Sequence, residues 1–258
     1  MARGSNSMMS RQFSIVFFSV FIVACASQQP KNTIDEKPII VELKQAKGII
    51  PQQDYDRFGK KIPYTPMANP YLQDKKPVSA AAKKAFRAAN KAYTSKQYVK
   101  AKKLFIEMTI KYKDLSGPWV KLAKMSEMKK DYKAAENEYR TAIKLNKKNV
   151  NAYLALGLMQ RHQGMFSQAQ NTYIDALKVW KDFPAAHLNL AVLYDMYLNL
   201  PAQSQPHFEA YVFLTGQKDK QAQKWLLEVS RRTKIKKSFI DSPPVIKTSE
   251  ISGEAIAQ

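Results

Sequence analysis

Cysteine, glycine and histidine are all scarce in this sequence. One cysteine among 258 residues, Cys25, excludes a disulfide framework and any metal site built on cysteine. The eight glycines form no phosphate-binding loop, and no serine elbow, metal-binding helix motif or paired-carboxylate pattern is present. The three histidines belong to no recognisable motif, so we expect them to be ordinary helix residues. The sequence therefore predicts no catalytic site, no metal site and no cofactor.

Acidic residues are also few, since 21 of them face 42 lysine and arginine residues, a net charge of +21. A basic helical protein of this kind could bind nucleic acid or another polyanion, which is the alternative to the function predicted below. The lysines between residues 83 and 148 are scattered, however, and do not form one stripe interleaved with aromatics. A weaker form of the idea is attraction to anionic lipid headgroups or acidic partner surfaces.

The N-terminus carries a short apolar run, Phe13 to Ala24, preceded by Arg3 and Arg11. Twelve residues of helix reach about 18 Å, too short for a hydrocarbon core of about 30 Å, so the run is typical of a secretory signal. It ends in Ile22-Val23-Ala24-Cys25, which resembles the bacterial lipobox. That resemblance implies a signal peptide at 1–24 and a lipid on Cys25. A signal without lipidation is the alternative, and Met8 or Met9 are alternative starts.

Prolines dominate the segment that follows, and they would interrupt any helix. We predict that residues 25–80 form a flexible, lipidated linker with short apolar motifs at 39–41 and 49–50. By the lipobox resemblance, alanine rather than aspartate after Cys25 favours the outer membrane. The prolines are Pro30, Pro38, Pro51, Pro63, Pro66, Pro70 and Pro77.

From residue 88 onward, positions 34 residues apart carry the same type of side chain. A fixed period of this length indicates stacked structural repeats. Within a unit the order is leucine, small, aromatic, alanine, aromatic, alanine. The recurring sets are Leu122, Leu156, Leu190; Ala89, Ala123, Gly157, Ala191; Tyr98, Tyr132, Phe166; Ala101, Ala135, Ala169; Phe105, Tyr139, Tyr173; and Ala142, Ala176, Ala210.

This pattern resembles the tetratricopeptide repeat (TPR) over residues 82 to about 217. The resemblance implies an all-α, right-handed solenoid of about four helix pairs plus a capping helix, on a disordered lipidated tether. Small residues would allow each pair of helices to cross closely, and no pair could bury its apolar face without the next. We assign 81–234 to this domain and its capping helix, and 235–258 to a disordered tail.

The fourth unit departs from the pattern, because Pro201 and Pro206 fall where its second helix should begin. We expect that helix to start near Pro206 with Ser204 as its N-cap. The stretch 218–234 predicts the terminal helix. Three acids, Asp182, Asp195 and Glu209, look like isolated solvated charges.

The TPR resemblance also implies a concave face, formed by the first helix of each unit. Chaperone-binding members hold a terminal carboxylate there with lysine and asparagine, but here only Asn90 matches, so we expect no such clamp. An apolar lining indicates either a bound partner or cover by the chain itself, such as the terminal helix. The expected lining is Phe86, Asn90, Tyr93, Val120, Lys124, Met128, Leu154, Leu158, Arg161, Leu188, Val192 and Met196.

Together these features predict a non-catalytic adaptor anchored at the periplasmic face of the outer membrane. Its partners would be proteins of a cell-envelope complex for pili, secretion or transport, with no nucleic acid and no small-molecule substrate. The layout resembles that of the pilotin lipoproteins of type IV pili, with fewer clear repeats and a longer tether. Regulators of peptidoglycan machinery and accessory proteins of energised transport share this layout.

Overall fold

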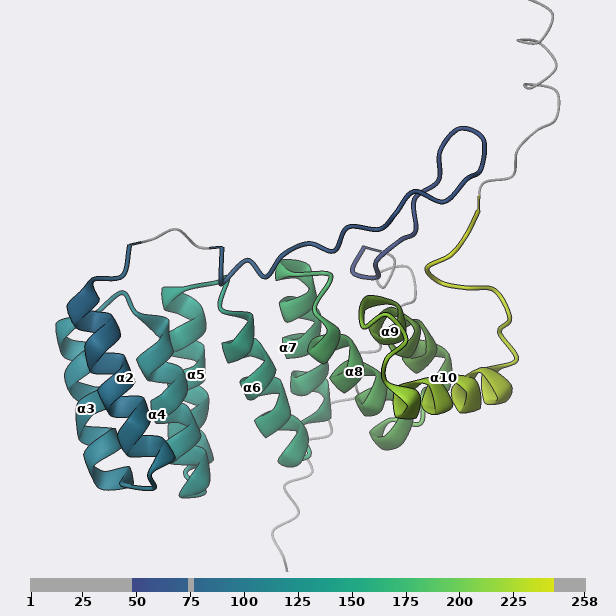
Figure 1. Cartoon of the computed structure of the whole chain (residues 1–258). Helices are drawn as coiled ribbons and strands as arrows, with labels where there is room; N and C mark the ends of the chain where they lie inside the picture. Colours follow the sequence, from purple (N-terminus) through teal and green to yellow (C-terminus); the bar gives the residue numbers. More distant parts are fainter. Residues whose placement is uncertain (1–47, 74–76, 244–258) are drawn as a thin grey trace, which may run out of the picture. The chain divides into compact units, whose positions relative to one another are not determined.

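The computed structural model describes residues 48–73 and 77–243, and this part of the chain is all-α, as predicted. Within it, no helix is long and apolar enough to cross a membrane. The helices (Figure 1) are α2 (Ala80–Thr94), α3 (Tyr98–Lys111), α4 (Ser116–Met128), α5 (Tyr132–Leu145), α6 (Val150–His162), α7 (Phe166–Val179), α8 (Pro184–Val192), the π-helical η1 (Leu193–Tyr197), α9 (Pro201–Leu214) and α10 (Lys220–Thr233).

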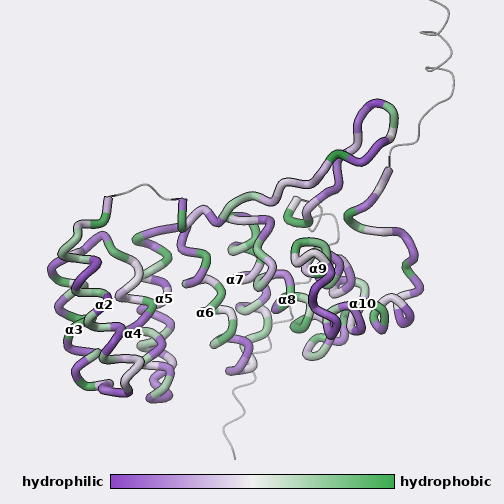
Figure 2. Tube along the Cα trace, in the orientation of Figure 1, coloured by the Kyte–Doolittle hydropathy of each residue, from purple (hydrophilic) through white to green (hydrophobic). Residues whose placement is uncertain are grey.

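The helix boundaries follow the 34-residue period of the sequence. The helices α4, α6 and α8 begin at residues 116, 150 and 184, and α3, α5 and α7 begin at 98, 132 and 166. Each first helix packs most extensively against the second helix of its own unit and then against the next unit. Figure 2 shows apolar and polar residues alternating along the helices, as such two-sided packing requires.

The turn inside each unit is also periodic. Lys96, Lys130 and Gly164 stand two residues before the second helices, and all three have a positive φ, of 59°, 61° and 74°. This left-handed conformation reverses the chain sharply after a helix end. Only Gly164 adopts it without steric cost. Polar N-caps start several helices, for example Ser79 before α2 and Asn149 before α6, each accepting a backbone N–H bond.

Small residues stand where the helices cross. Ala89, Ala123, Ala135 and Ala169 are fully buried. The tightest contact is at Gly157, where an added Cβ atom would lie 2.5 Å from the Tyr173 ring. Tyr173 itself is fully buried in the core between α6, α7 and α8. The register of small and aromatic positions predicted from the sequence is therefore confirmed.

The start of α9 corrects one prediction, since the helix begins at Pro201 and not near Pro206. Pro201 occupies the first helical position, where its missing N–H has no partner inside the helix. Pro206 lies within the helix, and Ser204 does not cap it. The buried Ser204 hydroxyl donates instead to the carbonyl of Ala191, which ties α9 to α8.

Two buried histidines also join α8 to α9. The Nδ1 atoms of His187 and His207 are 3.0 Å apart, and His187 Nε2 is 2.7 Å from the Lys181 carbonyl. A carbonyl only accepts, so His187 carries its proton on Nε2 and its Nδ1 accepts from His207 Nδ1–H. Both rings are neutral in this arrangement. Burial lowers the pKa of His187 to about 4, and burial together with His187 lowers the pKa of His207 well below its usual value.

Residues 48–73, which we call the strap, correct the prediction of a flexible linker over 25–80. Ile49, Ile50 and Pro51 are buried, because the apolar pair at 49–50 packs into the cores around α7 to α9. Farther along, Trp180 Nε1 donates to the Met67 carbonyl at 2.7 Å. The strap is therefore part of the folded domain. Residues 25–47 of the predicted linker, with Cys25, and the signal at 1–24 lie outside the described residues.

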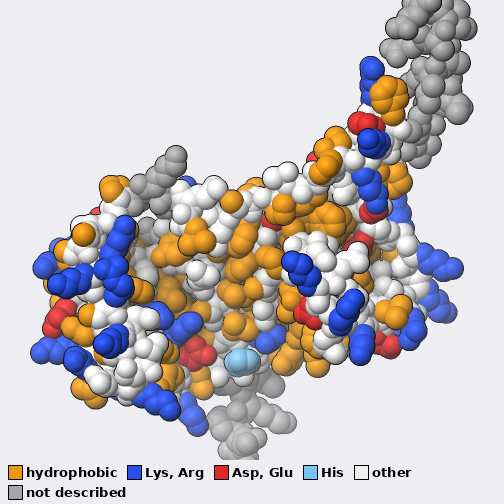
Figure 3. Space-filling model, in the orientation of Figure 1, with side chains coloured by type: hydrophobic (Ala, Val, Ile, Leu, Met, Phe, Trp, Pro, Cys, Tyr) orange, Lys and Arg blue, Asp and Glu red, His pale blue; other side chains and the backbone are white. Residues whose placement is uncertain are grey.

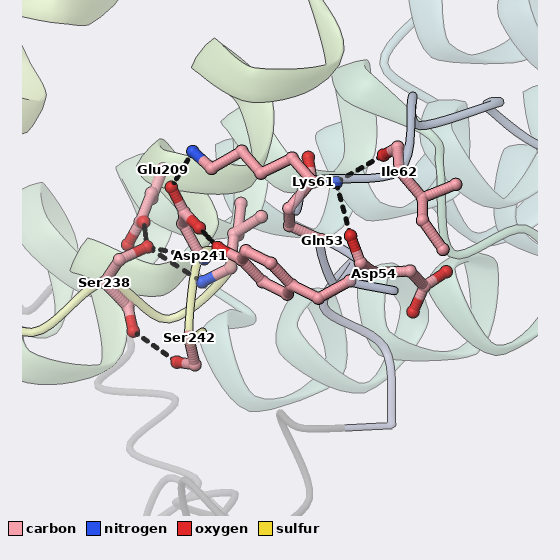
Figure 4. A network of polar contacts seen from close by, with 10 residues as sticks. Gln53, Asp54, Lys61, Ile62, Glu209, Ser238, Asp241 and Ser242 are labelled. Carbon is pink, nitrogen blue, oxygen red and sulfur yellow. Dashed lines mark hydrogen bonds and ion pairs between the residues drawn. The ribbon is translucent and has the colours of Figure 1, made fainter. Parts of the chain in front are cut away.

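The strap also pairs with residues 238–242, which corrects the prediction of a disordered tail for this stretch (Figure 4). Gln53 N–H donates to the Ile240 carbonyl at 3.0 Å, and Ile50 and Ile240 share one apolar cluster with Ala210. Asp241 accepts a hydrogen bond from Tyr55 and pairs with Lys61. The tail beyond residue 243 lies outside the described part.

The three acids expected to be solvated each have a partner. Asp182 is 3% exposed and accepts from Tyr64 Oη and Met67 N–H, both at 2.6 Å. Asp195 pairs with Arg232, and Glu209 accepts from the hydroxyl of Ser238. A buried carboxylate needs such bonds, which sequence separation conceals.

Gly157→Ala should destabilise the protein by about 1–3 kcal/mol, because its Cβ would overlap the buried Tyr173 ring. Gly117→Ala is the matched control in another helix, where the added Cβ would meet its nearest atom at 3.4 Å. Better helix propensity should leave that variant neutral or up to about 1 kcal/mol more stable. Urea unfolding of both variants is the measurement, and equal midpoints would contradict the packing described at Gly157.

The histidine pair predicts a loss of stability in mild acid. Its pKa values are depressed in the folded state, so its contribution is complete above the unfolded value of about 6.5 and falls as pH drops toward 4. The urea midpoint should therefore fall between pH 7.5 and pH 5. The double variant His187→Gln/His207→Asn removes both titrating rings and should flatten this dependence. An unchanged slope would show that other groups cause it.

Candidate functional site

The predicted lining residues occur on the first helices of successive units, and we call this surface the inner face. In the first three units its apolar members are only half-buried. Phe86 packs edge-on against Phe105 with ring centroids 5.7 Å apart, and Val120 and Leu154 contact the cores behind them. Met128 is 52% exposed. The structure thus brings the first three units' positions together as a partly covered apolar surface.

A groove of about 450 Å³ opens on this face across α2, α4 and α6. It runs along the carboxyl-terminal halves of these helices, where the 34-residue register places equivalent positions side by side. Five of the predicted residues meet in or beside it. Its lining includes Tyr93, Lys124, Glu127, Met128, Leu158 and His162.

Cations dominate the charge of the groove. Lys121 Nζ lies 5.1 Å from the centre of the Tyr93 ring, and burial, with Lys124 nearby, lowers the Lys121 pKa. The one acid in the lining, Glu127, accepts a hydrogen bond from Tyr139 Oη at 3.0 Å. Burial and Glu127 raise the Tyr139 pKa, which keeps the phenol protonated as a donor. The groove therefore offers positive charge beside apolar side chains.

Arg161 extends this positive surface toward η1. Its guanidinium lies 5.5 Å from the centre of the Tyr197 ring, which also contacts Phe166 at 5.2 Å. Among the described residues, Arg161 Nε and Asn90 Oδ1 are buried without a hydrogen-bond partner. Unpaired buried polar atoms cost free energy, so a bound chain that reached them would gain stability.

The fourth unit answers the question of self-cover. Leu188 and Val192 pack against Leu226 of α10, in one cluster with Phe208 and Val229. The ion pair between Arg232 and Asp195 closes the same junction. The terminal helix thus covers the fourth unit's part of the inner face, although Met196 is 71% exposed. Leu158 and Leu188, one register position apart, therefore differ in whether the chain itself covers them.

Some groove residues were not among those predicted. Lys121, Tyr132 and Tyr139 lie at the site, and Lys121 could have been found because it precedes Lys124 by three residues, a spacing that places both on one helix face. Tyr139 was predicted only as a packing residue. Its hydroxyl reaches the site because α5 packs directly behind α4.

Other kinds of site can be described only for residues 48–73 and 77–243. Within these ranges no group of three or more His, Cys, Asp or Glu residues lies close enough together to hold a metal ion. Cys25, the predicted lipid attachment point, is outside them. His187 and His207 are structural residues of the α8–α9 junction.

The helix pairs, their 34-residue register and their stacking define a TPR-like helical repeat fold. No protein-family model matches the sequence, and no curated protein is similar to it. Similar solved structures include PilF of Pseudomonas aeruginosa, with a TM-score of 0.52 and 15% identity over 60% of this chain and 69% of that one. Residues 41 to the end of MamA from Desulfovibrio magneticus RS-1 give 0.50 and 14%, over 61% and 88%. At such identity the likeness shows the fold.

Proposed function

We propose that this chain is a non-catalytic adaptor that binds a segment of another protein in the groove across α2, α4 and α6. The observation that carries the proposal is the difference between units. The chain covers the inner face of its fourth unit with α10, whereas Leu158 and Met128 line a groove in the units before it. Partly exposed apolar surface in a groove is typical of a binding site.

The charges favour an acidic partner segment with apolar anchors. Lys121, Lys124 and Arg161 supply positive charge, and Glu127 is engaged by Tyr139. Apolar side chains of the partner would lie against Leu158 and Met128, and its carboxylates would face the lysines. The unpaired atoms of Asn90 and Arg161 supply one acceptor and one donor for such a segment.

We further propose that the adaptor is lipid-anchored through Cys25 at the periplasmic face of the outer membrane. The support is the sequence alone: the basic and apolar signal followed by Ile22-Val23-Ala24-Cys25. The partners would then belong to an envelope complex such as a pilus, secretion or transport machine.

Leu158→Glu and Lys124→Glu should each reduce the recovery of one specific partner at least tenfold, since a carboxylate in the groove would repel an acidic segment. The assay is quantitative mass spectrometry of proteins crosslinked to the full chain in membranes. Neither change should shift the melting temperature by more than about 2 °C, because both positions lie at the open groove.

Leu188→Glu is the matched control, because Leu226 of α10 packs against Leu188. Introducing a charge there should cost about 2 kcal/mol or more and lower the melting temperature by roughly 5 °C. If Leu158→Glu left both partner recovery and the melt unchanged, the assignment of the groove would fail.

Cys25→Ser should prevent anchoring, because acylation needs the thiol. Metabolic labelling with a fatty-acid analogue should mark the wild-type chain and not the variant, and the variant should lose its carbonate-resistant membrane association. The conservative change alters one atom, so folding should be unaffected. Equal labelling of the two chains would refute the lipid anchor while leaving the groove proposal intact.

A further inference from the structure

A second cavity, of about 580 Å³, lies between α9, α10 and the residues that follow α10. Four cations line it: Arg231, Lys234, Lys236 and Lys237. Leu226 and Ile235 supply its apolar wall. We call this cavity the basic pocket. It is separate from the groove, which lies across α2, α4 and α6.

The basic pocket contains little negative charge to balance these cations. Its acid, Glu209, already accepts from the Ser238 hydroxyl and from Phe239 N–H. Arg231 pairs with Glu228 only at 3.9 Å, and both side chains are more than 60% exposed, so this pair is weak. Residues 218–237 hold eight lysine and arginine residues and two acids, which leaves +6. Clustered like charges favour binding of an anion.

The exposed surface of α10 continues the same chemistry. Lys220, Lys224, Leu227 and Arg231 recur at intervals of four, three and four, so they form one stripe along the helix. Leu227 is 53% exposed between the cations. Figure 3 shows lysine and arginine side chains gathered over α10, and a second gathering over α2 and α3. Cations around an exposed apolar side chain are typical of helices that lie on anionic membranes.

The strap arrives at this same end of the domain. Gln53 bonds to Ile240, only three residues after Lys237, and Ile50 and Ile240 lie in one cluster. The chain therefore enters the folded domain from its N-terminal side next to the basic pocket. Of the two basic gatherings, this is the one that adjoins the segment leading from Cys25.

We propose that the basic pocket and the α10 stripe bind the headgroups of anionic phospholipids, with Leu227 entering the interface. A lipid phosphate would lie among Arg231, Lys234, Lys236 and Lys237, and the lysines of the stripe would contact neighbouring headgroups. The surface turns the capped end of the domain toward the membrane and leaves the groove for a partner. This inference rests on the proposed membrane location, but its test excludes the acyl chain.

The test uses the full chain with Cys25→Ser and vesicles of phosphatidylcholine with or without 30% phosphatidylglycerol. In co-sedimentation at 0.1 M salt, the triple variant Arg231→Gln/Lys236→Gln/Lys237→Gln should bind the anionic vesicles on the order of 100-fold more weakly, since each cation held near the surface adds roughly fivefold. Lys84→Gln/Lys100→Gln/Lys144→Gln removes the same charge elsewhere and should weaken binding less than threefold. Leu227→Gln should weaken it severalfold. Thermal melts should be unchanged.

Equal weakening by the two triple variants, or equal binding to neutral vesicles, would overturn the proposal. So would displacement by inorganic phosphate beyond that by chloride at matched ionic strength, which would indicate a site for the free ion. A salt-resistant complex with single-stranded DNA, lost in the first triple variant, would assign the surface to nucleic acid instead. Leu158→Glu should leave vesicle binding unchanged, so this inference and the groove can fail separately.

Discussion

The structure depends on the close crossing of paired helices, of which the Tyr173 ring against Gly157 is the tightest example. Such a crossing buries one side of each helix pair and leaves the other to be covered by the next pair. The 34-residue register follows from this need, and it also sets which residues reach the inner face. Because Leu158 and Leu188 occupy equivalent positions, the difference between them arises only from what lies over them. The groove is the place where stacking and cover stop.

The fourth unit shows how the stack is closed. A π-helical turn replaces the end of α8, α9 begins at Pro201, and a neutral histidine pair fills the space where alanine and an aromatic stand in earlier units. α10 then covers the remaining apolar surface with Leu226 and Val229. The outward side of this cap is strongly basic, and the strap reaches it from the N-terminal side. Cover, charge and the entry of the chain therefore coincide at one end of the domain.

The sequence predicted what is local and periodic. The helix pairs and the small residues at their crossings follow from a repeat visible in the residues themselves, and so does the inner face. The contacts of Asp182 with Tyr64 and Met67 could not be predicted, because they join residues more than 110 positions apart with no repeating pattern. For the same reason the strap resembled a linker: its prolines exclude helix but do not exclude a packed, extended segment. Self-cover of Leu188 depends on the path of the chain after Leu214, which no periodicity determines.

The central claim is that the inner face of the first three units receives a protein partner and that the fourth unit's face does not. Site-specific photocrosslinking in intact cells tests it most directly, with the photoreactive residue placed in turn at Met128, Leu158 and Leu188, and at Lys144 on the second helix of the second unit. The account predicts that positions 128 and 158 crosslink to the same protein and that 188 and 144 do not. Crosslinks of equal yield to that protein at position 144, or none at 128 and 158, would contradict it.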